Sequence, residues 1–190
     1  MTGPPPPGSG PPRVQFEVPL TPTVSVSFQR TPCPAGGVLA ELPRSWGALP
    51  AVLDGPEDLA VPVPDGEAVW IGLLSESGAP VQSVSVVAVL APGGPTDAVT
   101  GRPVGGQPPG TVTLPPTTAV IGVLREGGGW WALTRVAPGN GAPACSRVDL
   151  RTPTDRLVAH LVPPSATTAR AGVEVPPLDP AAPYGGWRLP

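Results

Sequence analysis

Residues 13–29 read RVQFEVPLTPTVSVSFQ, and apolar side chains recur at every second position on both sides of a proline-bounded turn. Val14, Phe16 and Val18 alternate with polar residues before the turn, and the alternation resumes at Val24. A period of two places the apolar side chains on one face of an extended chain, which is the pattern of a half-buried β-strand. This stretch therefore predicts two strands that contribute to one core.

The same pattern continues through most of the chain. Short apolar or alternating runs follow one another, separated by turns that contain proline or glycine. Proline lacks a backbone N–H and glycine adopts conformations that other residues avoid, so both interrupt regular structure. Residues 43–58 and 92–110 are expected to be irregular. Further strands are predicted at 38–42, 67–74, 81–90, 111–114, 119–124, 130–136, 145–151 and 173–175.

One segment has the spacing of a helix. Apolar residues at positions 157, 158, 161 and 162 stand at i, i+1, i+4 and i+5, which places them on one side of a helix. Thr154 is suited to cap its start, and Pro163 is suited to end it. We expect one short helix over 154–162, with a strand as the alternative.

Two segments resemble each other. The octapeptide IGLLSESG at 71–78 matches IGVLREGG at 121–128 in five of eight positions. Each lies between two predicted strands, which is the pattern of a β-hairpin. Two explanations stay open: a hairpin unit duplicated at about 61–94 and 111–140, or two strands of one sheet that solve the same packing problem, which we favour. Gly72 and Gly122 indicate a bulge or the close approach of another backbone.

The composition favours an all-β fold. The 190 residues include 33 prolines and 25 glycines, yet 40% are hydrophobic and the net charge is only -3. Disordered chains usually combine low hydrophobicity with high charge, so most of this chain is expected to fold. Prolines recur too often for a coiled coil or a helical bundle. About ten short strands with one helix predict a β-sandwich or a jelly-roll-like fold.

The two ends differ from the middle in composition. Residues 1–12 read MTGPPPPGSGPP, and such a proline run favours an extended polyproline II arm. Residues 13–175 are predicted to form a single β domain. Residues 176–190 form a second proline-rich tail, which ends in PYGGWRLP.

Several classes of protein are disfavoured. Cys33 and Cys145 are too few for a disulfide scaffold or a zinc site, and we expect two buried free thiols, with a disulfide between them as the alternative. No run is long and apolar enough for a membrane span, and no signal peptide is visible, so a cytoplasmic protein is expected. The arginines are scattered in an acidic chain, which disfavours nucleic acid as a partner.

The sequence contains few residues that could form a catalytic site. His160 is the single histidine, and it lies near Ser146 and Asp149 in the chain without the motif of a nucleophile elbow. Glu67, Glu76 and Glu126 offer carboxylate pairs, but two of them lie in glycine-rich loops where a charge keeps the turn hydrated. We therefore expect no enzyme, no cofactor and no metal ion.

The aromatic residues are the candidate contact residues. Five of the eight aromatics are tryptophan, and Trp130 and Trp131 are adjacent on a predicted strand, so their rings point to opposite faces. One ring enters the core and the other lies outside, where tryptophan is typical of binding hot spots. Tyr184 and Trp187 in the tail complete the set of candidate binding residues.

Two classes of function follow. The first is a non-enzymatic structural or adaptor subunit of a larger protein assembly, cellular or viral, which contacts a protein partner or further copies of itself through its extended ends. The second is a carbohydrate-binding module that uses exposed tryptophans. The sequence favours the first, because the arm and tail are suited to docking.

Overall fold

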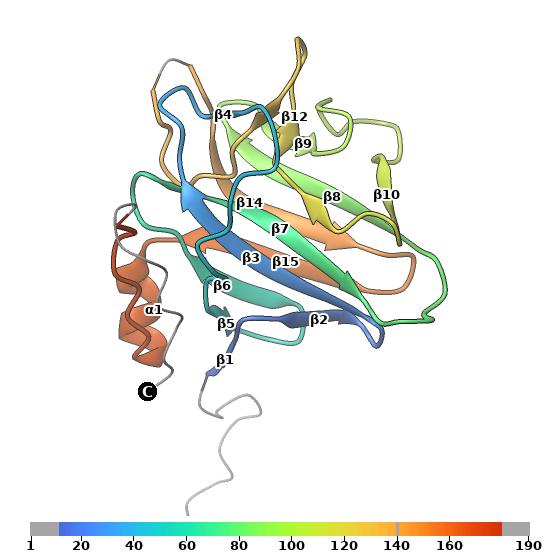
Figure 1. Ribbon diagram of the computed structural model, residues 1–190, viewed down its shortest axis with the longest axis horizontal. Coiled ribbons are helices and arrows are strands. Elements are labelled where there is room, and N and C mark those ends of the chain that lie inside the picture. The colour runs from blue at the N-terminus through green and yellow to red at the C-terminus, as the bar shows by residue number, and fades with distance from the viewer. Residues whose placement is uncertain (1–11, 140, 180–190) are drawn as a thin grey trace, which may run out of the picture.

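The computed structural model describes residues 12–139 and 141–179, which contain fifteen strands in three sheets and one short helix (Figure 1). The predicted all-β, sandwich-like fold is confirmed. Within the described residues no helix is long and apolar enough to cross a membrane. The tail residues Tyr184 and Trp187 and nearly all of the predicted arm lie outside the described residues.

The largest sheet has eight strands, of which all but one pair are antiparallel. The exception is the parallel pair β6 and β15, which join segments about a hundred residues apart in the chain. β9 (Gly94–Asp97) and β10 (Thr111–Leu114) both pair with β8 (Gln82–Ala91) and form the other edge of the sheet. From the far edge inward the order is β1 (Arg13–Gln15), β5 (Ala51–Leu53), β6 (Asp58–Pro62), β15 (Arg156–Val162), β14 (Ala144–Arg151) and β8 (Gln82–Ala91).

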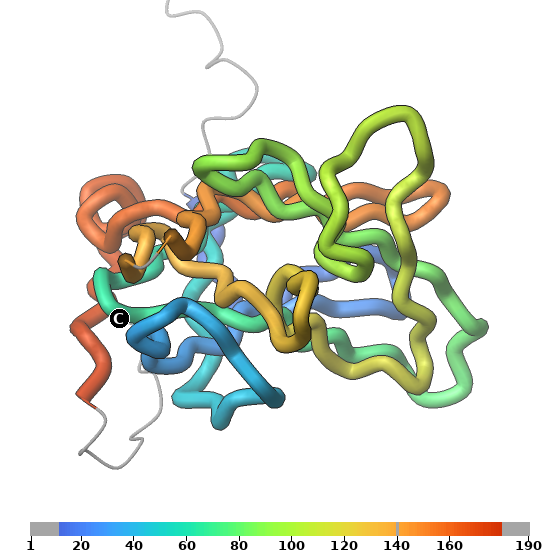
Figure 2. Tube along the Cα trace, turned by 90° about the horizontal axis from the view of Figure 1, so that it is seen from above, coloured from blue at the N-terminus to red at the C-terminus, as the bar shows by residue number. Residues whose placement is uncertain are grey.

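A four-stranded sheet packs against the inner face of the eight-stranded sheet. Its centre is the pair β3 and β7, which stay in register over nine residues. Figure 2 shows the two layers from above, with β14 and β15 in orange on one side and β3 in blue on the other. Its strands are, in order, β11 (Ala119–Val120), β7 (Glu67–Ser75), β3 (Val24–Pro32) and β2 (Val18–Thr21).

The alternation noted in residues 24–29 explains the core. Val24, Val26 and Phe28 on β3 are fully buried, whereas the serines between them are half-buried on the outer side. The inward residues meet Val86 and Leu150 from the other sheet within one hydrophobic cluster. Burying a side chain of this size contributes about 1.5–3 kcal/mol to the free energy of unfolding. The alternation of apolar residues on the facing sides of the two sheets therefore stabilises the sandwich.

A third sheet of three short strands lies at one end. It contains β12 (Val123–Leu124), β13 (Trp130–Trp131) and β4 (Val38–Leu39). A small satellite cluster of Leu39, Ala68 and Ala132, with Cys33 and Ile121 against it, joins this sheet to β7.

The helix predicted over 154–162 is wrong, because this segment is strand β15. Leu157, Ala159 and Leu161 point into the core, and Arg156 and His160 lie exposed on the other side. The i, i+4 spacing of the apolar residues also fits a strand whose outer face carries a buried valine, Val158. Backbone pairing with β14 on one side and β6 on the other favours the strand over the helix.

The helix begins directly after β15, at α1 (Pro164–Ala171). Pro164 is at its first position, where the missing N–H costs nothing, and Gly172 ends it with a left-handed conformation at φ 67°. The strand predicted at 173–175 is also wrong. Val173 and Val175 are buried in the core without pairing as a strand.

The first predicted hairpin is likewise wrong. β7 belongs to the four-stranded sheet and β8 to the eight-stranded sheet, so residues 75–82 cross from one layer of the sandwich to the other. In contrast, β12 and β13 do form a hairpin, with Val123 opposite Trp131. The two similar segments therefore fold differently, with β7 in the four-stranded sheet and β12 in the three-stranded sheet. The favoured explanation, two strands of one sheet, does not hold for them, and the alternative of a duplication stays a prediction. The stretches expected to be irregular contain strands β5 and β9.

The loop of residues 98–110 is organised by one buried carboxylate. Asp97 accepts hydrogen bonds from the backbone N–H groups of Val99, Thr100 and Gly110 at 2.8, 3.3 and 2.7 Å, and from the Thr100 hydroxyl at 2.7 Å. A hollow of about 430 Å³ opens between this carboxylate and the rest of the loop. Burial alone raises the pKa of Asp97, but these hydrogen bonds outweigh it, so its pKa is lowered from the ordinary 3.8.

Asp97→Ala is expected to reduce the free energy of unfolding by about 1–3 kcal/mol at neutral pH, since three N–H groups lose their acceptor. A lowered pKa in the folded state means that the stabilisation is complete above the ordinary pKa and disappears as the pH falls through the folded-state value. Urea unfolding of both proteins between pH 7 and pH 2 measures it. The difference should be constant near neutrality and shrink below about pH 4; a difference that grows on acidification would contradict this account.

Candidate binding face

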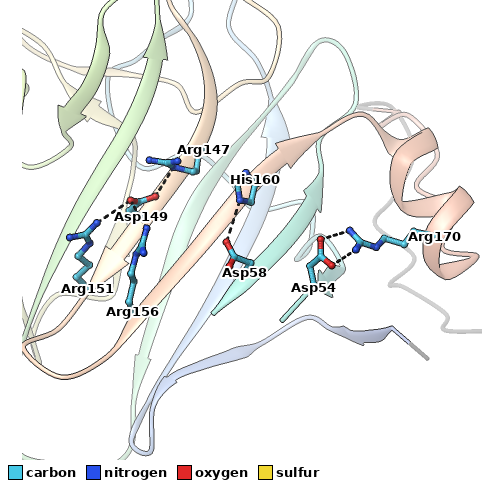
Figure 3. Close-up of polar contacts among 8 residues, drawn as sticks. All are labelled: Asp54, Asp58, Arg147, Asp149, Arg151, Arg156, His160 and Arg170. Atoms are coloured by element: carbon cyan, nitrogen blue, oxygen red, sulfur yellow. Dashed lines mark hydrogen bonds and ion pairs between the residues drawn. The ribbon is translucent and has the colours of Figure 1, made fainter. Parts of the chain in front are cut away.

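The outer face of the eight-stranded sheet carries a row of charged side chains (Figure 3). Because the side chains of a strand alternate, the residues between the core positions of β14 and β15 all point outward. We call this surface the charged face. It consists of Arg147, Asp149 and Arg151 on β14, Arg156 and His160 on β15, Asp58 on β6, Asp54 after β5 and Arg170 on α1.

Asp149 is the centre of the row. It is only 4% exposed, because three arginine side chains surround its carboxylate. Arg147 Nε lies 2.8 Å from Oδ1, and the Nη2 atoms of Arg151 and Arg156 each lie 3.4 Å from Oδ2. The Arg147 contact lacks hydrogen-bond geometry, so it is an ion pair only. One carboxylate thus holds three guanidinium groups together, and most of their N–H donors remain directed elsewhere.

Further along the face the charges change sign. His160 Nε2 lies 3.4 Å from Asp58 Oδ1 on the neighbouring strand. Asp54 forms a bidentate ion pair with Arg170 of α1 (Figure 3). Asp54 and Glu57 lie in the exposed turn between β5 and β6, and Asp58 is the first residue of β6, so all three belong to the exposed segment DGPED at 54–58.

Uncharged residues border the arginines on the other side. Val87 and Val89 of β8 lie opposite Asp149 and Arg147 in the register, and both are half-buried. The face therefore combines a basic cluster, an acidic turn and two partly exposed valines on one surface. These are the ingredients of a protein contact surface, in which arginine is enriched.

The two adjacent tryptophans occupy different surroundings. Both are half-buried, and Trp131 packs against the main core, whereas Trp130 lies opposite Leu39 of β4. The Arg125 guanidinium lies over the Trp131 ring, 4.3 Å from its centre. A hollow of about 330 Å³ opens beside Trp131, lined also by Arg125 and Glu126. Since one ring face is covered by arginine and the ring packs on the core, Trp131 has little free surface for stacking.

The sequence-predicted catalytic candidates do not form one site. Ser146 donates to the Val89 carbonyl oxygen, whereas His160 contacts Asp58. Glu67 lies in the core, paired with Arg30, while Glu76 is exposed in a loop. No group of three metal-ligating side chains occurs within the described residues.

Both cysteines are free thiols. Cys145 is buried as expected, and Cys33 is half-buried. Burial raises the pKa of Cys145 to about 12. Burial also raises the pKa of Cys33, which a hydrogen bond with Thr134 offsets only in part. Neither side chain is therefore a reactive thiolate at neutral pH.

A buried ion pair closes one end of the core. Arg30 and Glu67 have side chains only 6% and 5% exposed, with Nε to Oε2 at 2.8 Å and Nη2 to Oε1 at 2.5 Å. The start of the tail binds to this pair, since Arg30 Nη2 donates to the Pro176 carbonyl at 3.0 Å and the Leu178 N–H donates to Glu67 Oε1 at 2.7 Å. At least this part of the tail contacts its own domain.

The sequence pattern did not predict this pair, although its residues stand at inward positions of two strands. Arg30 continues the inward series of Val24, Val26 and Phe28, and Glu67 stands two residues before inward Val69. Opposite charges at inward positions of two strands indicate a buried pair once the pairing of β3 with β7 is known.

No protein-family model, no curated protein and no solved structure matches this chain.

Proposed function

We propose that the protein is a non-enzymatic structural or adaptor subunit that binds a protein partner, and that the charged face is its contact surface. The observation that carries this proposal is the burial of Asp149 beneath three arginines on the outer, solvent-facing side of a sheet. The proposed setting is the cytoplasm, with a virus particle as the second candidate.

Binding to a partner explains the three arginines around Asp149 better than a contribution to the stability of the fold does. A carboxylate needs one bidentate arginine, whereas Asp149 is shared by three whose side chains are 39%, 53% and 42% exposed. Exposed ion pairs contribute little to stability, so a third arginine adds almost nothing to the fold. The same guanidinium groups, already ordered by Asp149, lose less conformational entropy when they bind carboxylates of a partner.

A photo-crosslinking residue at Val89 is expected to capture a protein partner in cells that contain the natural partner. Val89 borders the arginine cluster and is half-buried, so the probe lies at the edge of the proposed contact. Leu74, which is 60% exposed on the outer face of the other sheet, is the matched control position. A discrete crosslinked species at Val89, absent at Leu74 and lost with Arg151→Gln, is the expected result. Equal capture at both positions, or none at Val89, would remove the charged face as the contact surface.

Carbohydrate binding is the second candidate function, and the hollow beside Trp131 favours it. It ranks lower because Arg125 covers one face of the ring on which a sugar would stack. A glycan array with the natural chain and Trp131→Ala distinguishes the two. Binding that the variant loses would favour the carbohydrate function.

A further inference from the structure

The charged face divides into a basic half and an acidic half. Arg147, Arg151 and Arg156 against Asp149 leave an excess of two positive charges on β14 and β15. Asp155 in the adjoining turn reduces this excess to one; its carboxylate accepts from the hydroxyls of Thr152 and Thr154.

The acidic half is the segment at 54–58. Asp54, Glu57 and Asp58 against Arg170 leave an excess of two negative charges. His160 lies between the halves, and it contacts Asp58. With Asp155 included, the basic half carries a net charge of +1 and the acidic half a net charge of -2, so the two halves are opposite in sign.

The register places both halves on the same surface. Asp149 lies opposite Val158, and Val158 lies opposite Asp58, so the two carboxylates are at the same level of the sheet, two strands apart. Neighbouring strands are about 4.8 Å apart, which separates the halves by about 10 Å. Figure 3 shows the basic group and the acidic group along one row across the sheet.

We propose that the charged face binds the same face of a second copy of this chain, around a two-fold axis that passes near His160. A two-fold rotation about an axis between the halves brings the arginine cluster of each copy onto the acidic turn of the other. The contact is then made twice, as in every isologous dimer. This inference rests on the proposed function, because it names the partner of the charged face.

The charge pattern favours a second copy over a uniformly acidic partner. An acidic surface large enough to cover the face would meet Asp54, Glu57 and Asp58 as well as the arginines, and like charges in contact cost several kcal/mol. A long polyanion would also be repelled by the net charge of -3 of the whole chain. A copy of the same face has both signs at the required spacing.

Matched charge-reversal variants test the dimer. Arg151→Glu with Arg156→Glu gives both halves of the face a net negative charge, and Glu57→Arg with Asp58→Arg gives both halves a net positive charge. We expect the natural chain to be a dimer that high salt dissociates, and each variant alone to dimerise at least about tenfold more weakly. An equimolar mixture of the two variants should form a heterodimer, because each acidic half then meets a basic half. Light scattering and native mass spectrometry across a series of protein concentrations measure both.

Two controls protect the test against misfolding. Arg44→Glu with Arg102→Glu reverses two exposed arginines outside the face and should leave the dimer unchanged. Arg151→Gln with Arg156→Gln removes charge without placing new carboxylates beside Asp149, and it should also weaken the dimer. It replaces the glutamate variant in the test if circular dichroism shows that the glutamate variant is unfolded.

The outcomes separate this inference from the proposed function. A monomeric natural chain, or a mixture that does not form the heterodimer although both variants are folded, overturns the dimer. If Val89 nevertheless captures a different protein, the subunit function remains and only the identity of its partner changes. A monomer without capture at Val89 removes both.

Discussion

Replacing Arg30 with alanine is expected to lower the free energy of unfolding by about 3–5 kcal/mol. The change removes the guanidinium that pairs with Glu67 inside the core, and it leaves a carboxylate that is only 5% exposed and still accepts a hydrogen bond from the Leu178 N–H. An uncompensated charge in a medium of low polarity is costly, which makes this pair sensitive to the loss of one partner. Equilibrium unfolding in urea, followed by tryptophan fluorescence, measures the effect.

The matched control is Arg170→Ala. Arg170 also forms a bidentate pair, with Asp54, but both side chains are more than 40% exposed. Water replaces such a contact readily, so the loss should be at most about 1 kcal/mol. The double replacement Arg30→Met with Glu67→Leu should be less harmful than Arg30→Ala, because no buried charge is left. Equal effects of Arg30→Ala and Arg170→Ala on the free energy of unfolding would show that burial does not determine the cost of losing one partner of an ion pair.

The second large effect is expected for Gly122→Ala, at about 3 kcal/mol. A Cβ at this position would lie 2.2 Å from the Trp131 carbonyl oxygen, and that oxygen belongs to the backbone of β13 and cannot move away alone. The methyl group therefore forces β12 and β13 apart. Thermal unfolding and the near-ultraviolet circular dichroism of the tryptophans report both the stability and the local change.

Gly72→Ala is the control for this prediction. Its Cβ would lie 2.6 Å from Ser27 Oγ, which is the end of a small side chain that can rotate at the cost of its hydrogen bond with Gln29. The loss should stay under about 1 kcal/mol. If the two substitutions had the same effect, close backbone approach at Gly122 would not be the cause.

The core strand β3 could be predicted from local pattern alone. Val24, Val26 and Phe28 alternate with serines, and the structure buries all three in a nine-residue strand. Gly122, within the strand predicted at 119–124, correctly indicated a close backbone, because only a residue without a side chain allows such an approach. The structure interrupts that strand at 121–122, between β11 and β12. Both inferences need only the geometry of an extended chain.

Pairing could not be predicted in the same way. Residues 156–162 carry apolar side chains at a spacing compatible with a helix, yet they lie between β14 and β6 as a strand. β7 and β8 follow each other with a short loop, yet each pairs in a different sheet. The local spacing of apolar residues shows which side chains can share a face, but it does not distinguish a helix from a strand or one sheet from another. Pairing with segments up to a hundred residues away in the chain selects the structure that forms.

The charged face shows the same division. Arg147, Arg151 and Arg156 are close together in the chain, with Asp149 and Asp155 among them. Their alternation along β14 and β15 does place them on one surface, but the burial of Asp149 results from the pairing of the two strands. Asp58 and Arg170 joined the face only through the tertiary structure, since neither is near the arginine cluster in the chain.

By itself, the sequence determined that this chain is a β protein with alternating core strands, interrupted by proline and glycine. These properties follow from side-chain period and backbone freedom, which act between residues close in the chain. The tertiary structure alone decided which strands share a sheet, where the tail begins to bind its own domain at Arg30 and Glu67, and which charges meet on the outer face. Those contacts depend on burial and on hydrogen bonds between distant segments, whose free energies exist only once the two layers have packed.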